Sequence, residues 1–425
     1  MRVLVNSFAA AAVAFSVGCS SDAPPTTGPS LIPTACTGIN LGPRPTALSL
    51  SQSTPPSLRV LGSGVEAARY TAEIAVRGNL AYTSTWQIRQ AAGNKINIWD
   101  VTGNTPLLVD SVIVSAAITT GDVAVSDDGT LLVVATELSP GSIAVYDLTN
   151  PQKPQLLSRF TNDQTAPGVH TAELGRVNGK LYAFLSIDPS GSTLARLVTV
   201  DLSTPTAPKQ VFVKIAGTPY VHDTYQRDGL LFVALWNDGV DIWDIGGCGS
   251  GATPDNPRVI GNVKTVGGKV HNIWWYHDPN GSKRFAFVGE EGSGTIGSSS
   301  SGDVHVIDIS DPSAPTEVAF YHVDGAGTHN FSVDEANGVL YAAYYNGGVR
   351  AIDVRGDLAA CSSSQKTVDQ STGRTRCDLR LMGRELAIGL NNVGRAVYVW
   401  GVQYLNGNLY ASDMINGIWK LAPAK

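Results

Sequence analysis

The sequence predicts an all-β fold, a seven-bladed β-propeller whose ring is closed by an N-terminal strand that completes the last blade. Three observations lead to this prediction. Of the 425 residues, 43% are hydrophobic, 16% are charged and 45 are glycine, a composition typical of many short strands joined by turns. A strand that ends in Asp returns roughly every 45 to 65 residues, the period of four-stranded blades. A glycine-containing hairpin turn precedes most of these strands.

The charge balance excludes one class of partner. The formal net charge is −6 and the sequence contains no run of Lys and Arg, so nothing in it matches the basic surface of a nucleic-acid-binding protein. We therefore expect no nucleic-acid partner.

The first element, residues 1–18, is predicted to be a lipoprotein signal peptide. Arg2 supplies a positive charge, and Phe8 to Val17 form an apolar stretch too short to span a bilayer. Ser16-Val17-Gly18-Cys19 resembles a lipobox, which predicts lipidation of Cys19. The alternative is an ordinary secretory signal that is cleaved nearby. Both place the mature protein outside the cytoplasm, and Ser20 favours the outer membrane or cell surface in a cell with two membranes.

The second element, residues 19–56, is rich in Ser, Thr, Pro and Gly. Such a composition does not repay the entropy of ordering, so it predicts a tether between a membrane and a domain formed by residues 57–425. Cys36 lies within this segment, so part of the tether is expected to be held in place.

The third element is the repeat itself. Its strands end at Asp100, Asp147, Asp201, Asp244, Asp308 and Asp353. The Asp carboxylate can accept backbone N–H groups of the following turn, and a Pro in that turn needs no hydrogen-bond partner. Asn178-Gly179, Asp228-Gly229 and Asn337-Gly338 supply the positive φ angles that tight hairpins require.

One blade can be written out over residues 222–263. Its four strands are expected to begin at His222 and to cover Leu230–Leu235, Val240–Ile245 and Arg258–Val263. The same template yields seven blades, and the last one stops after its third strand. Leu58–Leu61 has the register of the missing strand, so pairing the two chain ends would remove an exposed edge.

The repeated pattern resembles the LVIVD repeat of bacterial and archaeal surface proteins. Its clearest copy is Ile307-Asp308-Ile309-Ser310-Asp311-Pro312-Ser313-Ala314-Pro315, and the resemblance covers roughly residues 57–421. The pattern is broken at Lys420, where Asp is expected, and at Arg355-Gly356, which replaces the Pro turn. The resemblance implies a secreted or surface-anchored β-propeller and says little about activity.

Four of the seven histidines occupy the same template position, at the start of the innermost strand: His170, His222, His271 and His329. At the same position, blade one has Tyr70, blade two has Thr120 or Gly121, and blade seven has Trp400. The innermost strands line the central channel, so the four imidazoles are expected to form an arc at one mouth. They could chelate one transition-metal ion, Zn, Fe or Cu. They could also be a recurring structural device of the repeat, or transfer protons.

Further residues are expected near this mouth. Glu173 and Asp223 could orient the histidine rings. Long loops are expected there at 86–90, 187–192 and 289–301, and such loops often carry binding sites. In the last of them, Glu290 and Glu291 could bind Ca²⁺ or act as acid and base, or could simply form a solvated acidic turn.

The five cysteines fit an exported chain. With Cys19 lipidated, four remain, which is consistent with two disulfides. Cys361 and Cys377 bracket a polar insertion in blade six, and this leaves Cys36 to pair with Cys248. A zinc site is the weaker alternative, because the sequence contains no Cys-x-x-Cys. The template places Cys248 on the face opposite the histidines, and we expect that face to lie toward the membrane.

These observations support three hypotheses of function. The first is a lipid-anchored, monomeric binding module at the cell envelope that takes a protein, glycan or small ligand at the histidine mouth. The second is a metal-dependent enzyme, redox or hydrolytic, with the four histidines as ligands. The third is a purely structural envelope module.

Overall fold

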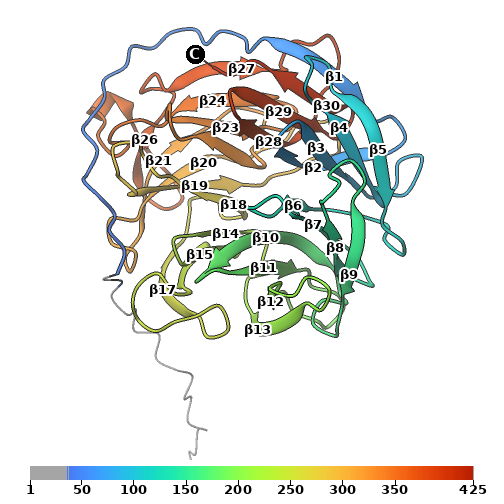
Figure 1. The fold of residues 1–425 in the computed structure, drawn as a ribbon. Helices are drawn as coiled ribbons and strands as arrows, with labels where there is room; N and C mark the ends of the chain where they lie inside the picture. The colour runs from blue at the N-terminus through green and yellow to red at the C-terminus, as the bar shows by residue number, and fades with distance from the viewer. Residues whose placement is uncertain (1–35, 37, 425) are drawn as a thin grey trace, which may run out of the picture. The chain divides into compact units, whose positions relative to one another are not determined.

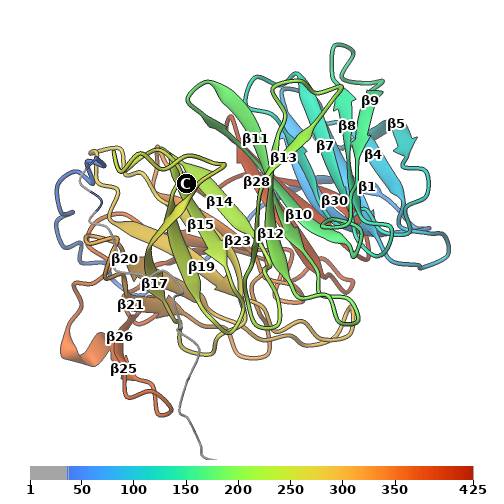
Figure 2. The same ribbon diagram turned by 90° about the horizontal axis from the view of Figure 1, so that it is seen from below.

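The computed structural model describes residue 36 and residues 38–424. These residues form seven blades, each built on four antiparallel strands and one extended to six strands. Figures 1 and 2 show the blades arranged around a common centre. The only helical element in the described part of the chain is the single 3₁₀ turn η1 (Ser363–Gln365). The prediction of an all-β, seven-bladed propeller is therefore confirmed.

Each of the first six blades takes its strands in chain order from the channel outward. The strands of blades one to three are β2 (Tyr70–Arg77), β3 (Leu80–Trp86), β4 (Lys95–Asp100) and β5 (Leu107–Ile113); β6 (Val123–Val125), β7 (Leu131–Thr136), β8 (Ser142–Asp147) and β9 (Gln155–Phe160); β10 (Val169–Val177), β11 (Lys180–Ile187), β12 (Arg196–Asp201) and β13 (Lys209–Ile215).

The strands of blades four to six are β14 (Thr224–Arg227), β15 (Leu230–Ala234), β16 (Val240–Asp244) and β17 (Arg258–Val263); β18 (Val270–Trp275), β19 (Phe285–Glu290), β20 (Val304–Asp308) and β21 (Thr316–Tyr321); β22 (Phe331–Asp334), β23 (Val339–Ala343), β24 (Val349–Asp353) and β27 (Glu385–Gly389). The blade written out from the sequence thus has its fourth strand at the predicted residues. Its innermost strand begins two residues later than predicted, because His222 and Asp223 both hydrogen-bond to Ala234 and interrupt the regular ladder.

The last blade contains β28 (Val399–Leu405), β29 (Asn408–Asp413), β30 (Gly417–Leu421) and the N-terminal strand β1 (Val60–Val65). Closure by an N-terminal strand is confirmed, although β1 begins and ends later than the predicted strand. The reason is that Leu58 donates its N–H to Ile388 of blade six, 2.8 Å away. The chain therefore meets blade six before it pairs with β30.

The repeated Asp residues act as the sequence predicts. Asp147 accepts the backbone N–H of Thr149 at 2.9 Å, and Asp308 accepts that of Ser310 at 2.8 Å. Among the hairpins, both residues of Asn178-Gly179 and Asp228-Gly229 have positive φ, whereas in Asn337-Gly338 only the glycine does.

In the last blade, Lys420 stands where the repeat has Asp, and its side chain makes a contact between blades. Lys420 Nζ donates to the carbonyl oxygens of Val101 at 2.7 Å and Gly103 at 3.0 Å, both in the turn that follows β4 of blade one. These hydrogen bonds link the last blade to the first, so Lys420 helps to close the ring.

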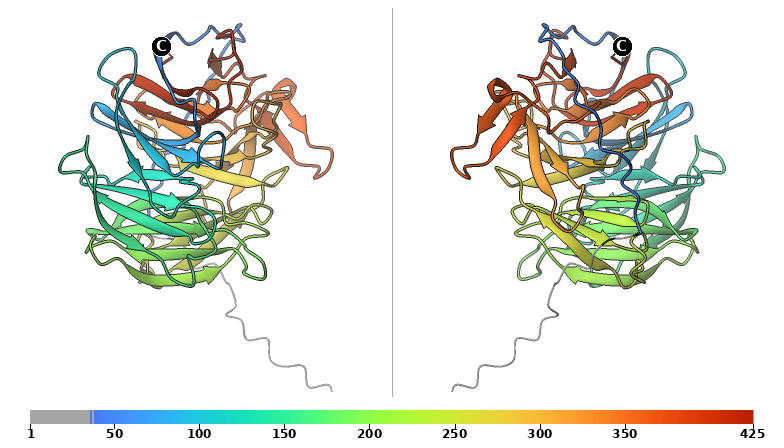
Figure 3. Two further views of the ribbon diagram at one scale, coloured as in Figure 1. Left: turned by 90° about the vertical axis from the view of Figure 1, so that its right-hand side faces the viewer. Right: turned by 90° about the vertical axis from the view of Figure 1, so that its left-hand side faces the viewer.

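The two disulfides join Cys36 to Cys248 and Cys361 to Cys377. The second lies in the insertion of blade six, which contains β25 (Lys366–Val368) and β26 (Thr375–Asp378). This insertion does not extend its own blade, because β26 pairs in parallel with β21 and adds two strands to blade five. The hairpin protrudes from the side of the propeller (Figures 2 and 3).

The predicted signal peptide, Cys19 and the tether residues up to 35 lie outside the described residues. Residues 38–57 follow the outside of the propeller from blade four to blade six (Figure 1). Gly38 donates its N–H to Cys248, Arg44 bonds to Asp357, and Ser57 pairs with Ile388. This part of the segment is thus held against the propeller.

Candidate functional site

The innermost strands of the seven blades enclose a cavity of about 410 Å³ in the central channel. His170, His222, His271 and His329 all line it, together with Trp400. The structure therefore places the four predicted histidines in the channel, on four consecutive blades.

Backbone bulges aim these histidines at the channel. His170 is the extra residue in the pairing of β10 with β11. In blade four, His222 N–H donates to Ala234 at 2.9 Å, while Ala234 N–H donates to Asp223 at 2.8 Å. Two residues of the inner strand thus face one residue of the second strand, and the same pattern recurs at His329. A bulge redirects a side chain, so a repeated bulge produces a repeated inward imidazole.

The rings follow one another in an unbroken arc. His170 Nε2 lies 3.1 Å from His222 Nε2. The ring centroids of His222 and His271 are 4.0 Å apart, and so are those of His271 and His329. Trp400 ends the arc, with its ring 4.2 Å from that of His329.

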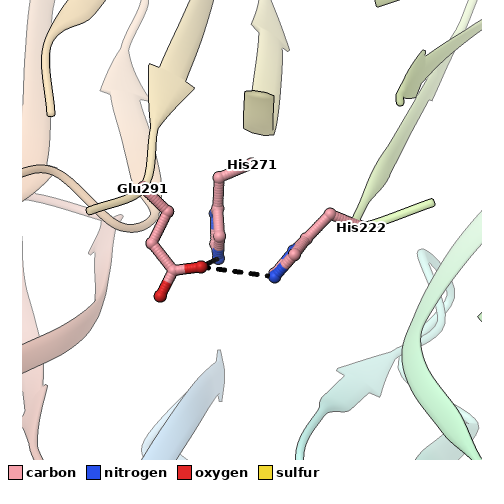
Figure 4. Close-up of side chains that lie close together, drawn as sticks. All are labelled: His222, His271 and Glu291. Atoms are coloured by element: carbon pink, nitrogen blue, oxygen red, sulfur yellow. Dashed lines mark ion pairs between the residues drawn. The ribbon is translucent and has the colours of Figure 1, made fainter. Parts of the chain in front are cut away.

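A carboxylate completes the arc. Glu291, in the loop after β19, places Oε2 3.5 Å from His222 Nε2 and 4.0 Å from His271 Nε2. Figure 4 shows the two imidazoles turned toward this carboxylate. Its other oxygen accepts a 2.5 Å hydrogen bond from the Tyr345 hydroxyl, so the orientation of Glu291 is held from outside the arc.

Two further carboxylates face the other side of the His170 ring. Its Nδ1 lies 3.5 Å from Glu137 Oε1 and 3.7 Å from Asp188 Oδ2. The indole N–H of Trp86 donates to the other Glu137 oxygen at 3.1 Å. Gly121 leaves the space for this, since a Cβ there would lie 1.8 Å from Glu137 Oε1. Blade two thus has glycine where blades three to six have histidine, and Glu137 fills the space.

The protonation states of this group are set by burial and by neighbouring charges. Burial lowers the pKa of His222 and His271, and lowers that of His329 to about 3. Burial opposes ionisation of Glu291, yet its hydrogen bond to His222 and the adjacent rings hold its pKa well below the usual value. For His170, burial is outweighed by Asp188 and Glu137, which raise the pKa to about 10. At neutral pH three imidazoles are therefore neutral, beside an ionised Glu291.

Several ring nitrogens have no hydrogen-bond partner among the described residues. Neither nitrogen of His271 has one, although its side chain is only 2% exposed. The Nδ1 atoms of His222 and His329 are also unpartnered. Leaving such groups buried and unsatisfied is costly, so a polar atom or ion bound within the arc would offset that cost.

The spacing suits a metal ion. Two groups of His and acidic side chains bring their ligand atoms within 4.8 Å of one another: His222, His271 and Glu291; and Glu137, His170 and Asp188. Ligands at about 2.1 Å from an ion lie about 3.0 to 3.4 Å apart. The 3.1 Å between His170 and His222 and the 3.5 Å between His222 and Glu291 are close to that spacing, and the 4.0 Å between His271 and Glu291 is longer.

The remaining predicted residues are placed differently. Glu173 accepts the backbone N–H of Gln226 and Asp223 accepts that of Thr224, and neither is paired with a histidine ring. The carboxylate at His329 is instead Glu73, whose Oε1 lies 3.6 Å from Nδ1.

Glu290 and Tyr70 lie beside the arc. Glu290 faces His305 of its own blade, with 3.5 Å between Oε2 and Nε2. Tyr70 packs against the aromatic cluster that contains Trp400, and Arg89 lies over its ring.

Sequence reasoning missed the role of the second strand of each blade. The end of this strand, or the loop directly after it, supplies the side chains that surround the histidine arc, namely Trp86, Glu137, Asp188, Glu291 and Tyr345. The three predicted loops contain Trp86, Asp188 and Glu291. Glu137 could have been found by applying the repeat register to the second strand as well as to the first.

Comparisons with known proteins bear on the fold. The family model described as LVIVD repeat matches residues 299–323, which contain β20, the Asp308 turn and β21. No curated protein matches this chain. None of the helical segments in the described residues is long and apolar enough to cross a membrane.

Among solved structures, the chain is similar to the crystal structure of RRP9 WD40 repeats. The TM-score is 0.56 at 12% identity, over 88% of this chain and 99% of that chain. This likeness shows the propeller fold alone. In all, 1110 chains of known structure match, so the fold is too widely shared to indicate an activity.

Proposed function

We propose that this chain is a lipid-anchored propeller of the cell envelope that acts as a binding module, and that its ligand is a transition-metal ion, Zn, Fe or Cu, at the mouth of the channel. Two disulfides support an extracytoplasmic location, because such bonds persist mainly in oxidising compartments. The lipobox-like Ser16-Val17-Gly18-Cys19 supports the anchor.

One observation carries the metal proposal. The buried imidazole of His271, with no hydrogen bond at either nitrogen, lies between His222 and His329 and faces the ionised Glu291. Neutral imidazole and carboxylate are the protonation states that bind a metal ion. Burial and charge have already selected both states in this protein.

The surrounding side chains resemble those that orient metal ligands elsewhere. Histidine ligands commonly donate their second ring N–H to a carboxylate. Glu137 and Asp188 stand in that position for His170, and Glu73 does so for His329. In this arrangement His222, His271 and Glu291 hold the ion, and His170 and His329 flank it in the arc.

The second candidate function is a metal-dependent enzyme, redox or hydrolytic, at the same site. The observation that favours it is the cavity of about 410 Å³, which is lined by the same histidines and can admit a small molecule next to the ion. Turnover of model ester, phosphate and phenol substrates by the metal-loaded protein, lost in Glu291→Gln, distinguishes this candidate from binding alone.

The test of metal binding is elemental analysis of the full chain, purified without a chelator or a polyhistidine tag. We expect about one equivalent of a transition metal, held by His222, His271 and Glu291, because the carboxylates of the other group face the protonated ring of His170. The His222→Ala/His271→Ala variant should lose it. His322→Ala is the matched control, since His322 is 46% exposed and pairs with Asp303 outside the arc.

A parent that holds no metal after challenge with Zn, Fe and Cu would overturn the proposal. Equal metal in the parent and the double variant would do the same. If the double variant does not fold, Glu291→Gln tests the same site without creating a cavity.

A further inference from the structure

Exposed apolar side chains gather on one side of the channel mouth. In each blade the first and third strands begin, and the second and fourth end, at the end of the ring where the histidines lie. Eight of the fifteen large hydrophobic side chains that are exposed among the described residues lie at this end. They come from blade seven, from blades one to three and from the segment leading into blade four, whereas the described residues of blades five and six contribute none. These eight form the apolar rim: Val65, Ile88, Ile113, Ile118, Leu138, Leu194, Ile215 and Tyr220.

The loops that carry much of the apolar rim are joined into one surface. Thr119 pairs with Gly93 of blade one and with Glu137 of blade two. Gly141 donates its N–H to Ala166 at 3.0 Å, in the segment that leads into blade three. Backbone hydrogen bonds therefore connect the mouth loops of three successive blades, and the apolar side chains project from a fixed framework.

Leu138 occupies its place in the apolar rim at a cost in backbone energy. Its φ angle is 63°, in the left-handed region that L-residues with a branched side chain rarely adopt. Its side chain is nevertheless 50% exposed, so this conformation contributes little apolar burial to the fold. Backbone strain of this kind is concentrated at functional positions, which favours a contact with something outside the chain.

Unpaired positive charges border the apolar rim. Arg69, Arg89, Arg159 and Arg196 donate to backbone carbonyls or to hydroxyl and amide oxygens, and none of the four forms an ion pair with a described carboxylate. The loops between these arginines contain one exposed acidic side chain, Asp163. The whole chain has a formal net charge of −6, yet this side of the mouth has an excess of positive charge.

This combination selects the kind of partner. Apolar tips can enter the acyl region of a bilayer, a tyrosine suits the headgroup level, and arginine side chains can extend to lipid phosphates. Anionic lipids attract such arginines. Because the apolar side chains come from separate loops of several blades, lipids can also fill the spaces between them, which a partner of fixed shape cannot do without matching each loop.

We propose that the apolar rim binds the surface of an anionic phospholipid bilayer, with Ile88, Leu138 and Leu194 in the acyl region and the four arginines at the phosphates. This contact goes beyond the function proposed above, and it needs neither a metal ion in the arc nor a lipid on Cys19. The histidine face then lies on the membrane, which is the reverse of the orientation expected from the disulfide face.

The experiment is co-sedimentation of the full chain with vesicles. Cys19→Ser is the background for every protein, so no acyl anchor contributes. We expect binding to vesicles that contain phosphatidylglycerol and much weaker binding to phosphatidylcholine alone. Leu138→Ser should weaken binding about fivefold, because half of a leucine side chain no longer enters apolar surroundings. Leu156→Ser is the matched control, since Leu156 is 58% exposed at the opposite end of blade two.

The charge contribution is tested in the same assay. Arg196→Gln should weaken binding to the anionic vesicles about fivefold. Lys209→Gln makes the same change of charge at an exposed position at the opposite end of blade three, and should leave binding unchanged. Circular dichroism checks that each variant is folded.

A local probe shows which face meets the lipid. A bimane label on Leu138→Cys should shift its emission to shorter wavelength on addition of the anionic vesicles, and a label on Leu156→Cys should not. Three outcomes would overturn the proposal: no binding to the anionic vesicles, equal binding by Leu138→Ser and Leu156→Ser, or a shift at position 156 without one at 138. Metal analysis of the same protein is independent of all three, so failure of this contact and failure of the metal site are distinguishable.

Discussion

His170 shows how a single residue connects the groups around the arc. Its Nε2 faces His222, while its Nδ1 faces Glu137 and Asp188. These carboxylates raise its pKa to about 10 against the effect of burial. A metal ion at Nε2 would therefore have to displace a proton, whereas the proton on Nδ1 can stay between the ring and its carboxylates.

Tyr345 gives the sharpest prediction at this scale. Its hydroxyl donates to Glu291 Oε1 at 2.5 Å. In Tyr345→Phe, Glu291 loses the group that orients it, so metal affinity should fall about 10- to 100-fold, the usual cost of removing a partner of a ligand. Competition with a chromogenic chelator measures this change.

Tyr344→Phe is the control. The neighbouring hydroxyl donates to backbone carbonyls at Gly302 and Tyr321 and does not touch Glu291. Equal affinities for the two variants would show that Glu291 is not a ligand.

The blade-six insertion shows how one element supports another. It crosses to blade five, where Arg376 donates to Glu317 at 2.5 Å and Glu317 accepts from His305 Nδ1 at 2.8 Å. Burial disfavours the charged form of His305, but Glu290 and Glu317 outweigh it and raise its pKa to about 9. The three side chains form a buried charged network that fixes the insertion to the propeller.

This network predicts a pH dependence of stability. The folded-state pKa of His305, about 9, exceeds its ordinary value of 6.5. The protonated ring therefore stabilises the fold fully below about pH 6.5, and this contribution is lost as the pH rises through 9. Its size is on the order of 3 kcal/mol.

Guanidinium unfolding of the parent and His305→Gln at pH 6, 7.5 and 9.5 tests this prediction. The difference in unfolding free energy between the two should shrink at high pH. A difference that does not change with pH would contradict it, and because both proteins share every other titrating group, the comparison isolates His305.

At the scale of the whole molecule, stability depends on joining the two ends of the ring. β1 pairs with β30 over five residue pairs from Val60↔Leu421 to Val65↔Gly417. Lys420 then fixes the last blade to the first through two backbone carbonyls. An open ring would expose the edge of β30 and the faces of blades one and seven.

Lys420→Met tests this contact. It keeps the length of a side chain that is 5% exposed and removes both hydrogen bonds, which leaves the carbonyl of buried Val101 unsatisfied, while that of exposed Gly103 can turn to solvent. We expect a loss of about 1 to 3 kcal/mol in the free energy of unfolding, measured by chemical denaturation. Lys366→Met, on the exposed insertion, should have little effect, and equal losses in the two variants would exclude a special role for Lys420.

The sequence by itself determined the parts of this protein that repeat. The Asp turns, the seven blades, the closing strand and the place of the four histidines all follow from hydrogen bonds within one blade. Each blade uses the same local hydrogen bonds. Residues at the same template position of successive blades are therefore expected to lie side by side around the ring.

The tertiary structure alone decided what lies between blades. Glu137 reaches His170 only because Gly121 leaves space. The blade-six insertion joins blade five, and Lys420 takes its partners from blade one. These contacts depend on how adjacent blades pack and on the paths of loops far apart in sequence. The sequence therefore showed the histidine arc and placed Glu291 and the loop of Asp188 near it, but not which histidine each carboxylate faces.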